Sequence, residues 1–349
     1  MADSSVGFNF SMHLSANHLY MIYPSLDALS LNLVSAEISS DPLRPAVNDT
    51  TYLDRISYSP DIDENFGSHL FLSEDRLHHI LYIDRESEES SVLKWLSKTD
   101  SEENWWIDAV PGFGKPLVAR ADQEGSLQTV IAEGSTLSLY RLTREGHPEP
   151  KALLPAGTLR PRGDVSVVRR GDYWAFTVYD DISKRLYVIH HLNDKLEAEP
   201  IYPAGAVHYS TIVDGRLLIL LFQPAQSSIA LLDRALIHAE VRDQQPFDVK
   251  SITLCEGTTS VFLTTYKEKR LFLFNERVTN QQDQSIYQLA LLRPESAESK
   301  YEKRILVKGE DQIQAFAALK NGDLLYVLYL RGGALILLSF SLAELEHSP

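Results

Sequence analysis

Apolar and polar residues alternate with a period of two along much of the chain, in short runs that end at turn-forming residues. Residues 165–168 alternate in this way, the chain turns at 170–172, and an apolar, aromatic run follows over 173–179. After a second tight turn, residues 186–191 alternate again. Successive side chains of a β-strand point to opposite faces, so this pattern predicts three antiparallel strands joined by two tight turns.

The same unit recurs seven times, each copy marked by a turn before its second strand. The turn anchors, 42 to 65 residues apart, are Asn17, Gly67, Gly125, Gly171, Gly215, Gly257 and Gly322. Stretches between the copies can supply a fourth strand, and a period of about 45 residues with four strands is typical of a β-propeller. We therefore predict an all-β protein: one propeller domain over residues 1–349, with seven antiparallel four-stranded blades and six blades as the alternative.

The widest spacing, 65 residues, lies before the last anchor and predicts an insertion at about 276–304. We expect it to be a solvated loop at the edge of a blade, with an extra hairpin or a lid as alternatives. The ends of the chain must also meet if the propeller closes. Residues 4–8 could pair with the last blade for this purpose.

The charge balance narrows the classes of partner. The chain has 33 Lys and Arg against 48 Asp and Glu, a formal net charge of −15. Phosphate backbones and anionic membranes attract clustered Lys and Arg, so we expect neither nucleic acid nor membrane as a partner. Cys255 is the single cysteine, which excludes an internal disulfide, and we find no signal-peptide pattern or membrane-spanning run. These features predict an intracellular, cytoplasmic protein.

The motifs of common metal and cofactor sites are largely missing. A weak calcium candidate is Asp61, Asp63 and Asn65, which alternate in one loop and offer oxygen ligands, although an acidic hairpin loop explains them as well. The pairs His78–His79 and His190–His191 cannot chelate one ion, because neighbours on a strand face opposite ways. We find no zinc-protease, nucleophile-elbow, phosphate-loop or dinucleotide pattern, and therefore expect no cofactor.

In a propeller the first strand of each blade lines a central channel. The polar members of the predicted first strands include two Arg, two His and several amides and hydroxyls, a set that suits a polar small molecule. Aromatic residues beside them could add surface. The predicted ligand-binding residues are His13, Arg55, Tyr58, Arg120, Trp174, His208 and Gln314. A water-filled channel with structural hydrogen bonds is the alternative.

Aromatic residues recur on the second strand of two copies, in the segments LYMIY (19–23) and YWAF (173–176). This rhythm resembles β-propellers of the fungal fucose-lectin-like type over most of the chain. The resemblance implies a carbohydrate-binding lectin or a related protein. Relatives of that fold in fungal natural-product pathways include cofactor-free pericyclases such as hetero-Diels–Alderases.

Three functions remain open. The first is a small-molecule-binding funnel that could also act as a cofactor-independent cyclase or pericyclase, by positioning and hydrogen bonding. The second is a non-catalytic scaffold for a protein partner, and the third is a lectin. We favour the first, because the polar residues predicted in the channel are varied.

Overall fold

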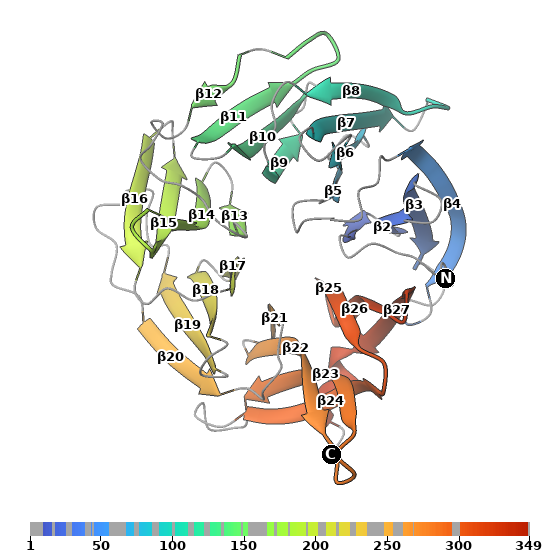
Figure 1. Cartoon of the computed structure of the whole chain (residues 1–349), viewed down its shortest axis with the longest axis vertical. Helices are drawn as coiled ribbons and strands as arrows, with labels where there is room; N and C mark the ends of the chain where they lie inside the picture. Colours follow the sequence, from blue (N-terminus) through green and yellow to red (C-terminus); the bar gives the residue numbers. More distant parts are fainter. Residues whose placement is uncertain are drawn as a thin grey trace. The chain divides into compact units, whose positions relative to one another are not determined.

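The chain forms antiparallel β-sheets that follow one another along the sequence (Figure 1). Figure 1 is drawn from a computed structural model. It describes residues 10–15, 18–25, 30–38, 43, 45–55, 68–72, 77–85, 91–99, 102–110, 115–121, 126–133, 136–147, 149–152, 166–170, 173–180, 182–192, 195–201, 207–213, 216–223, 228–235, 248–253, 261–267, 269–294 and 301–347.

Six of the sheets are complete four-stranded blades in simple up-and-down order, and a three-stranded sheet completes the series in the described residues. The prediction of an all-β, antiparallel β-propeller is therefore confirmed, with six complete blades, the number that the sequence offered as its alternative. The described chain divides into two compact units, and the prediction of one domain over residues 1–349 stays a prediction.

The first unit comprises Met1–Glu133, Leu137–Ala152 and Gln314–Pro349. It holds three four-stranded sheets and the three-stranded sheet, which leads into a short helix. Their strands are β1 (Ser11–Ser15), β2 (His18–Ser25), β3 (Ser30–Glu37), β4 (Ala46–Arg55), β5 (Ser68–Leu72), β6 (Leu77–Arg85), β7 (Ser91–Thr99), β8 (Trp106–Val110), β9 (Lys115–Ala121), β10 (Leu127–Glu133), β11 (Thr136–Leu142), β12 (Lys151–Ala152), β25 (Ile313–Asn321), β26 (Leu324–Arg331) and β27 (Ala334–Ser341), followed by α1 (Leu342–His347).

The second unit comprises Gly134–Thr136 and Leu153–Ile313. It holds three four-stranded sheets. Their strands are β13 (Ser166–Arg170), β14 (Tyr173–Asp180), β15 (Arg185–Leu192), β16 (Lys195–Ile201), β17 (Val207–Val213), β18 (Arg216–Gln223), β19 (Ser228–Ala235), β20 (Asp248–Thr253), β21 (Val261–Tyr266), β22 (Lys269–Thr279), β23 (Ser285–Pro294) and β24 (Tyr301–Gly309).

Consecutive sheets within a unit pack face to face and bury apolar side chains between them. The middle strands β18 and β26 show why, because almost every residue along them is apolar. Strands that are buried on both faces read as continuous apolar runs, whereas one-sided strands alternate. In the second unit Leu218 and Leu231 pack against Phe272 and Phe274 of the next sheet. The core therefore lies between sheets, and the fold is stabilised mainly by apolar area removed from water.

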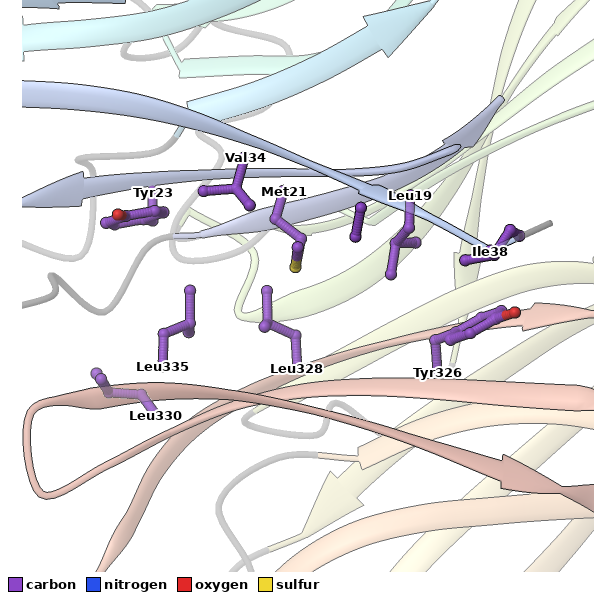
Figure 2. Close-up of a cluster of buried hydrophobic side chains, with 10 residues drawn as sticks. Leu19, Met21, Tyr23, Val34, Ile38, Tyr326, Leu328, Leu330 and Leu335 are labelled. Carbon is purple, nitrogen blue, oxygen red and sulfur yellow. The ribbon is translucent and has the colours of Figure 1, made fainter. Parts of the chain in front are cut away.

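The first and last sheets of the chain pack together inside the first unit (Figure 2). Figure 2 shows Leu19 and Met21 of β2 facing Tyr326 and Leu328 of β26. All four side chains are fully buried. The two ends of the described sequence are therefore joined by side-chain packing. The predicted pairing of residues 4–8 with the last blade lies outside the described residues.

Two of the predicted first strands are in fact fourth strands. Residues 52–55, expected to begin the second copy, end β4, and the next sheet begins with β5. Likewise β20 completes one sheet, and β21 begins the next. With β21 as the first strand, the stretch 276–304 supplies strands of that same sheet. It holds the end of β22, all of β23 and the start of β24. First and fourth strands show the same alternation of apolar and polar residues, so the pattern alone does not show which strand begins each sheet.

The wrong assignment of β20 as a first strand has a local cause, in the turn between β21 and β22. A tight hairpin turn needs a residue with positive φ, which Gly adopts at low cost. Gly322 supplies it between β25 and β26 with φ of 55°. Between β21 and β22 the residue is Lys267, with φ of 46°. A search for Gly or Asn therefore places this turn too early, at Gly257.

No helix among the described residues is long and apolar enough to cross a membrane.

The Tyr326 hydroxyl tests the packing between the first and last sheets. Tyr326 is fully buried, and none of the described residues forms a hydrogen bond with its hydroxyl oxygen. An unsatisfied buried hydroxyl costs about 1–3 kcal/mol, so Tyr326→Phe should raise the free energy of unfolding in chemical denaturation by about 1 kcal/mol. The matched change Tyr82→Phe removes a hydroxyl that donates to Asp54 and should lower it. Equal effects of the two variants would contradict the described packing.

Candidate functional site

The residues predicted to line a channel are spread over several sheets. His13 lies half-buried on the first strand β1, and Gln314 lies exposed on the first strand β25. Arg120 and His208 lie on the first strands β9 and β17, and their side chains are outside the description. The placement of these four on first strands is confirmed, and their role in binding stays a prediction.

The other predicted residues are placed differently or not at all. Arg55 is exposed at the end of the fourth strand β4, so the prediction that it lies on a first strand is wrong. Trp174 lies on the second strand β14, is 5% exposed, and contacts His191 edge-on with ring centroids 6.2 Å apart. Trp174 is therefore mainly a core residue. Tyr58 and the calcium candidates Asp61, Asp63 and Asn65 lie outside the described residues.

A polar group of four side chains lies between two sheets of the second unit. Tyr173, His190 and Glu199 come from β14, β15 and β16, and Arg234 comes from β19 of the neighbouring sheet. The Tyr173 hydroxyl lies 2.7 Å from His190 Nδ1. Arg234 Nη1 donates to Glu199 Oε2 at 2.7 Å, and Arg234 Nη2 lies 3.2 Å from His190 Nε2. We call these four residues the tyrosine–histidine group.

The group is layered from buried to accessible. His190 and Arg234 are 1% and 2% exposed, whereas the Glu199 side chain is 39% exposed and Tyr173 is half-buried. Apolar side chains of the same two sheets, which include Leu186 and Leu217, are fully buried. Tyr173 and Glu199 are therefore the more exposed members of the group, and the two buried residues hold them in place.

Burial and charge set the protonation states of the accessible residues. Burial raises the pKa of Tyr173; Arg234 opposes this rise and Glu199 adds to it. The neighbouring His190 and Arg234 hold the pKa of Glu199 below its usual range, against partial burial. At neutral pH the group therefore presents a protonated phenol beside an ionised carboxylate. A phenol can donate a hydrogen bond, and a carboxylate can only accept one.

Two further polar groups lie between sheets of the first unit. In one, Lys94 Nζ lies 3.0 Å from Asp54 Oδ2 and 2.8 Å from Asp84 Oδ2, while the Tyr82 hydroxyl donates to Asp54. Burial opposes a high pKa for Lys94, but its hydrogen bonds to Asp84 and Asp54 raise it. Each donor named here has an acceptor, so this group works as a latch between sheets.

The second of these groups surrounds Trp95. The Trp95 indole donates to His79 Nδ1 at 3.1 Å, and its ring contacts Trp106 edge-on at 5.1 Å. His147 Nε2 lies 2.8 Å from Asp108 Oδ2. Arg144, bound through two nitrogens to Glu102, also lies over Trp106. Hydrogen bonding from Arg144 lowers the pKa of Glu102 to about 2. These contacts join the residues after β11 to the sheet of β6, β7 and β8, which indicates a structural role.

No group of three or more His, Cys, Asp or Glu that could hold a metal ion is found in the part of the chain that the structure describes. The pair His190–His191 follows the prediction that neighbours face opposite ways, and the His78 side chain lies outside the description. His190 contacts Tyr173, whereas His191 contacts Trp174.

The sequence did not identify the tyrosine–histidine group, although it contained part of the signal. Tyr173 and His190 stand on adjacent strands of the best-defined copy, and antiparallel pairing brings His190 opposite Ala175, two residues from Tyr173. Arg234 lies 44 residues beyond His190, at the end of the apolar run 229–232 and next to Asp233. A charged residue at the end of such a run is a signal for a buried ion pair. Its partner could not be named without the packing of the two sheets.

Comparison with known proteins supports the fold. No family of sequences and no curated protein matches the chain. Among solved structures, the chain is similar to an ulvan lyase, a polysaccharide lyase solved with -[GlcA(1-4)Rha3S]- bound, with a TM-score of 0.61 and 11% identity over 97% of this chain and 94% of that one.

Two other solved structures show similar coverage. One is a virginiamycin B lyase from Staphylococcus aureus, solved with quinupristin, with a TM-score of 0.51 and 10% identity over 97% of this chain and 96% of that one. The other is the WD40 domain of SCAP from fission yeast, with a TM-score of 0.50 and 9% identity over 96% of this chain and 81% of that one. At such identities the likeness shows the β-propeller fold alone.

The depressed pKa of Glu199 predicts a pH-dependent contribution to stability. A group whose pKa is lowered on folding stabilises the protein above its ordinary value and loses this effect as the pH falls. Glu199→Gln should therefore be less stable than the natural protein above about pH 4.5, with the difference closing at lower pH. Chemical denaturation across pH 7 to about 3 measures this difference.

The control for this prediction is Glu302→Gln. Glu302 forms an ion pair with Arg293 at 2.5 Å and is 42% exposed, close to the 39% of Glu199, but Arg293 is 17% exposed whereas Arg234 is 1% exposed. Exposed pairs contribute at most about 1 kcal/mol, so this variant should differ little from the natural protein at any pH. A Glu199→Gln difference that stays constant with pH would contradict the described ion pair.

Proposed function

We propose that the protein binds a small polar ligand at the tyrosine–histidine group, and that the ligand is rich in hydroxyl groups, as carbohydrates are. The observation that carries the proposal is the pairing of a half-buried tyrosine with a partly exposed carboxylate beside a buried histidine and arginine. A sugar hydroxyl both donates and accepts, so neighbouring hydroxyls match a donor and an acceptor held side by side. Fixed, partly buried polar groups are typical of small-molecule sites.

The charge of the protein limits the kind of carbohydrate. A net charge of −15 repels polyanions, and the ionised Glu199 adds to this locally. Neutral or weakly charged ligands are therefore favoured. The similar fold of a polysaccharide lyase supports carbohydrate as the class only by analogy.

We further propose that the site catalyses a reaction without a cofactor. A phenol that donates to a ligand oxygen stabilises negative charge that develops there, and one such fixed donor can change a rate by roughly 100- to 1,000-fold. Elimination by a lyase places charge on a leaving oxygen, and a pericyclic rearrangement is also aided by polarising a carbonyl. Two proteins of similar fold are lyases, which favours elimination over the pericyclase and cyclase predictions. A lectin or a protein-interaction scaffold would bind without turnover.

Tyr173→Phe tests the proposal, because it removes only the hydroxyl. A carbohydrate array identifies a ligand of the natural protein, calorimetry measures its affinity, and mass spectrometry of the incubated ligand detects a product. Loss of one hydrogen bond should weaken binding about 5- to 10-fold. If the ligand is converted, turnover should fall roughly 100- to 1,000-fold.

Tyr179→Phe is the matched control. Tyr179 lies on the same strand and packs against the same apolar cluster as Tyr173, at the other end of β14. Tyr179→Phe should leave the affinity for the ligand and its turnover unchanged. Equal losses in both variants, or no loss in Tyr173→Phe, would contradict the proposed site. Binding without a product, lost in Tyr173→Phe, would make the protein a lectin.

A further inference from the structure

Two groups compete for the same nitrogen of His190. Arg234 Nη2 lies 3.2 Å from Nε2, and Glu199 Oε2 lies 3.4 Å from it. A guanidinium can only donate a hydrogen bond, so the contact with Arg234 requires a lone pair on Nε2. A carboxylate can only accept, so the contact with Glu199 requires a proton on Nε2. One nitrogen cannot meet both requirements, and the state of the ring follows from which neighbour prevails.

The number of buried charges favours the contact of Arg234 with His190 Nε2 over the contact of Glu199 with that nitrogen. The guanidinium is permanently charged and 2% exposed, and Glu199 already neutralises it through a 2.7 Å hydrogen bond. A protonated His190 would place a second cation in the same buried space, and the four-residue group has no second carboxylate for it. An uncompensated buried charge is strongly destabilising. The Arg234 contact is also the shorter of the two, while 3.4 Å is long for a hydrogen bond.

We infer that Arg234 is a positioning residue that holds His190 in its neutral form with the proton on Nδ1. Nδ1 then donates to the Tyr173 oxygen across the 2.7 Å contact. The hydroxyl proton of Tyr173 is left to point away from His190. A residue on the neighbouring sheet therefore sets the direction in which the tyrosine donates.

The inference extends the proposed function of Tyr173, and its consequence for ligand binding rests on that proposed function. With its proton directed outward, Tyr173 recognises an acceptor oxygen: an ether, a carbonyl, a carboxylate or the oxygen of a hydroxyl. The outward proton itself meets acceptors only, so an acceptor is favoured there over an ammonium or other pure donor. When Tyr173 transfers its proton to the ligand oxygen, the Nδ1 proton of His190 stabilises the negative charge left on the tyrosine oxygen.

The position of the histidine proton can be measured without any ligand. The full chain is labelled with ¹⁵N-histidine, and long-range proton–nitrogen NMR spectra at neutral pH distinguish the two neutral forms and the protonated form of each ring. His190→Gln assigns the His190 signals by their loss. We expect Nδ1 protonated and Nε2 unprotonated. A proton on Nε2, alone or on both nitrogens, would overturn the inference.

Variants test whether Arg234 is the cause. In Arg234→Met the proton should move to Nε2, where Glu199 accepts it, whereas Glu199→Gln should leave it on Nδ1. Retention of Nδ1–H in Arg234→Met would overturn the role of Arg234. If Arg234→Met does not fold, Arg234→Lys serves instead: a single ammonium donor still demands the Nε2 lone pair, and a shift of the proton there would overturn the inference.

Arg270→Met is the control. Arg270 also pairs across two sheets of the second unit, with Asp233, which keeps Arg216 as a partner at 2.6 Å. Arg270→Met should leave the His190 signals unchanged. A move of the His190 proton in this variant would show that the loss of any ion pair moves it. Failure of the carbohydrate screen would refute the proposed ligand and leave the tautomer measurement valid, so the two claims fail separately.

Discussion

A sheet of short strands cannot bury both of its own faces, and the rest of this structure depends on that constraint. Every sheet needs a neighbour, so the core forms between sheets: Leu218 and Leu231 against Phe272 and Phe274 is one example. The first and last sheets meet the same demand through Leu19, Met21 and Leu328. Packing of apolar faces therefore fixes the distance between sheets, and it fixes where their polar residues meet.

The polar groups follow from this packing. Side chains near the ends of the strands face the same spaces between sheets, and a polar atom that loses water there must find a partner. In the group of Asp54, Lys94 and Asp84, the lysine binds both carboxylates and so joins their strands. The tyrosine–histidine group differs, because its fully buried pair supports a half-buried tyrosine and a carboxylate that is 39% exposed. That difference separates a candidate site from a structural latch.

The sequence predicted the architecture well, because alternation and turn residues are local signals. Its errors arose where two strands carry the same signal: residues 52–55 alternate like a first strand but end β4, and Lys267 makes a turn that usually needs Gly. The site was largely beyond prediction. Arg55 seemed suited to a channel only because its strand was placed first, whereas Arg234 meets His190 only after two sheets have packed. Contacts across sheets depend on register and twist, which no local pattern encodes.

The central claim is that residues of two sheets act as one unit around His190. A double-mutant cycle on the free energy of unfolding tests it most directly, with His190→Gln, Arg234→Met and the double variant. Residues that share a buried network show coupling of about 0.5–3 kcal/mol, and the account predicts a value in that range. Additive effects within about 0.5 kcal/mol would contradict it, because the sheets would then merely lie side by side.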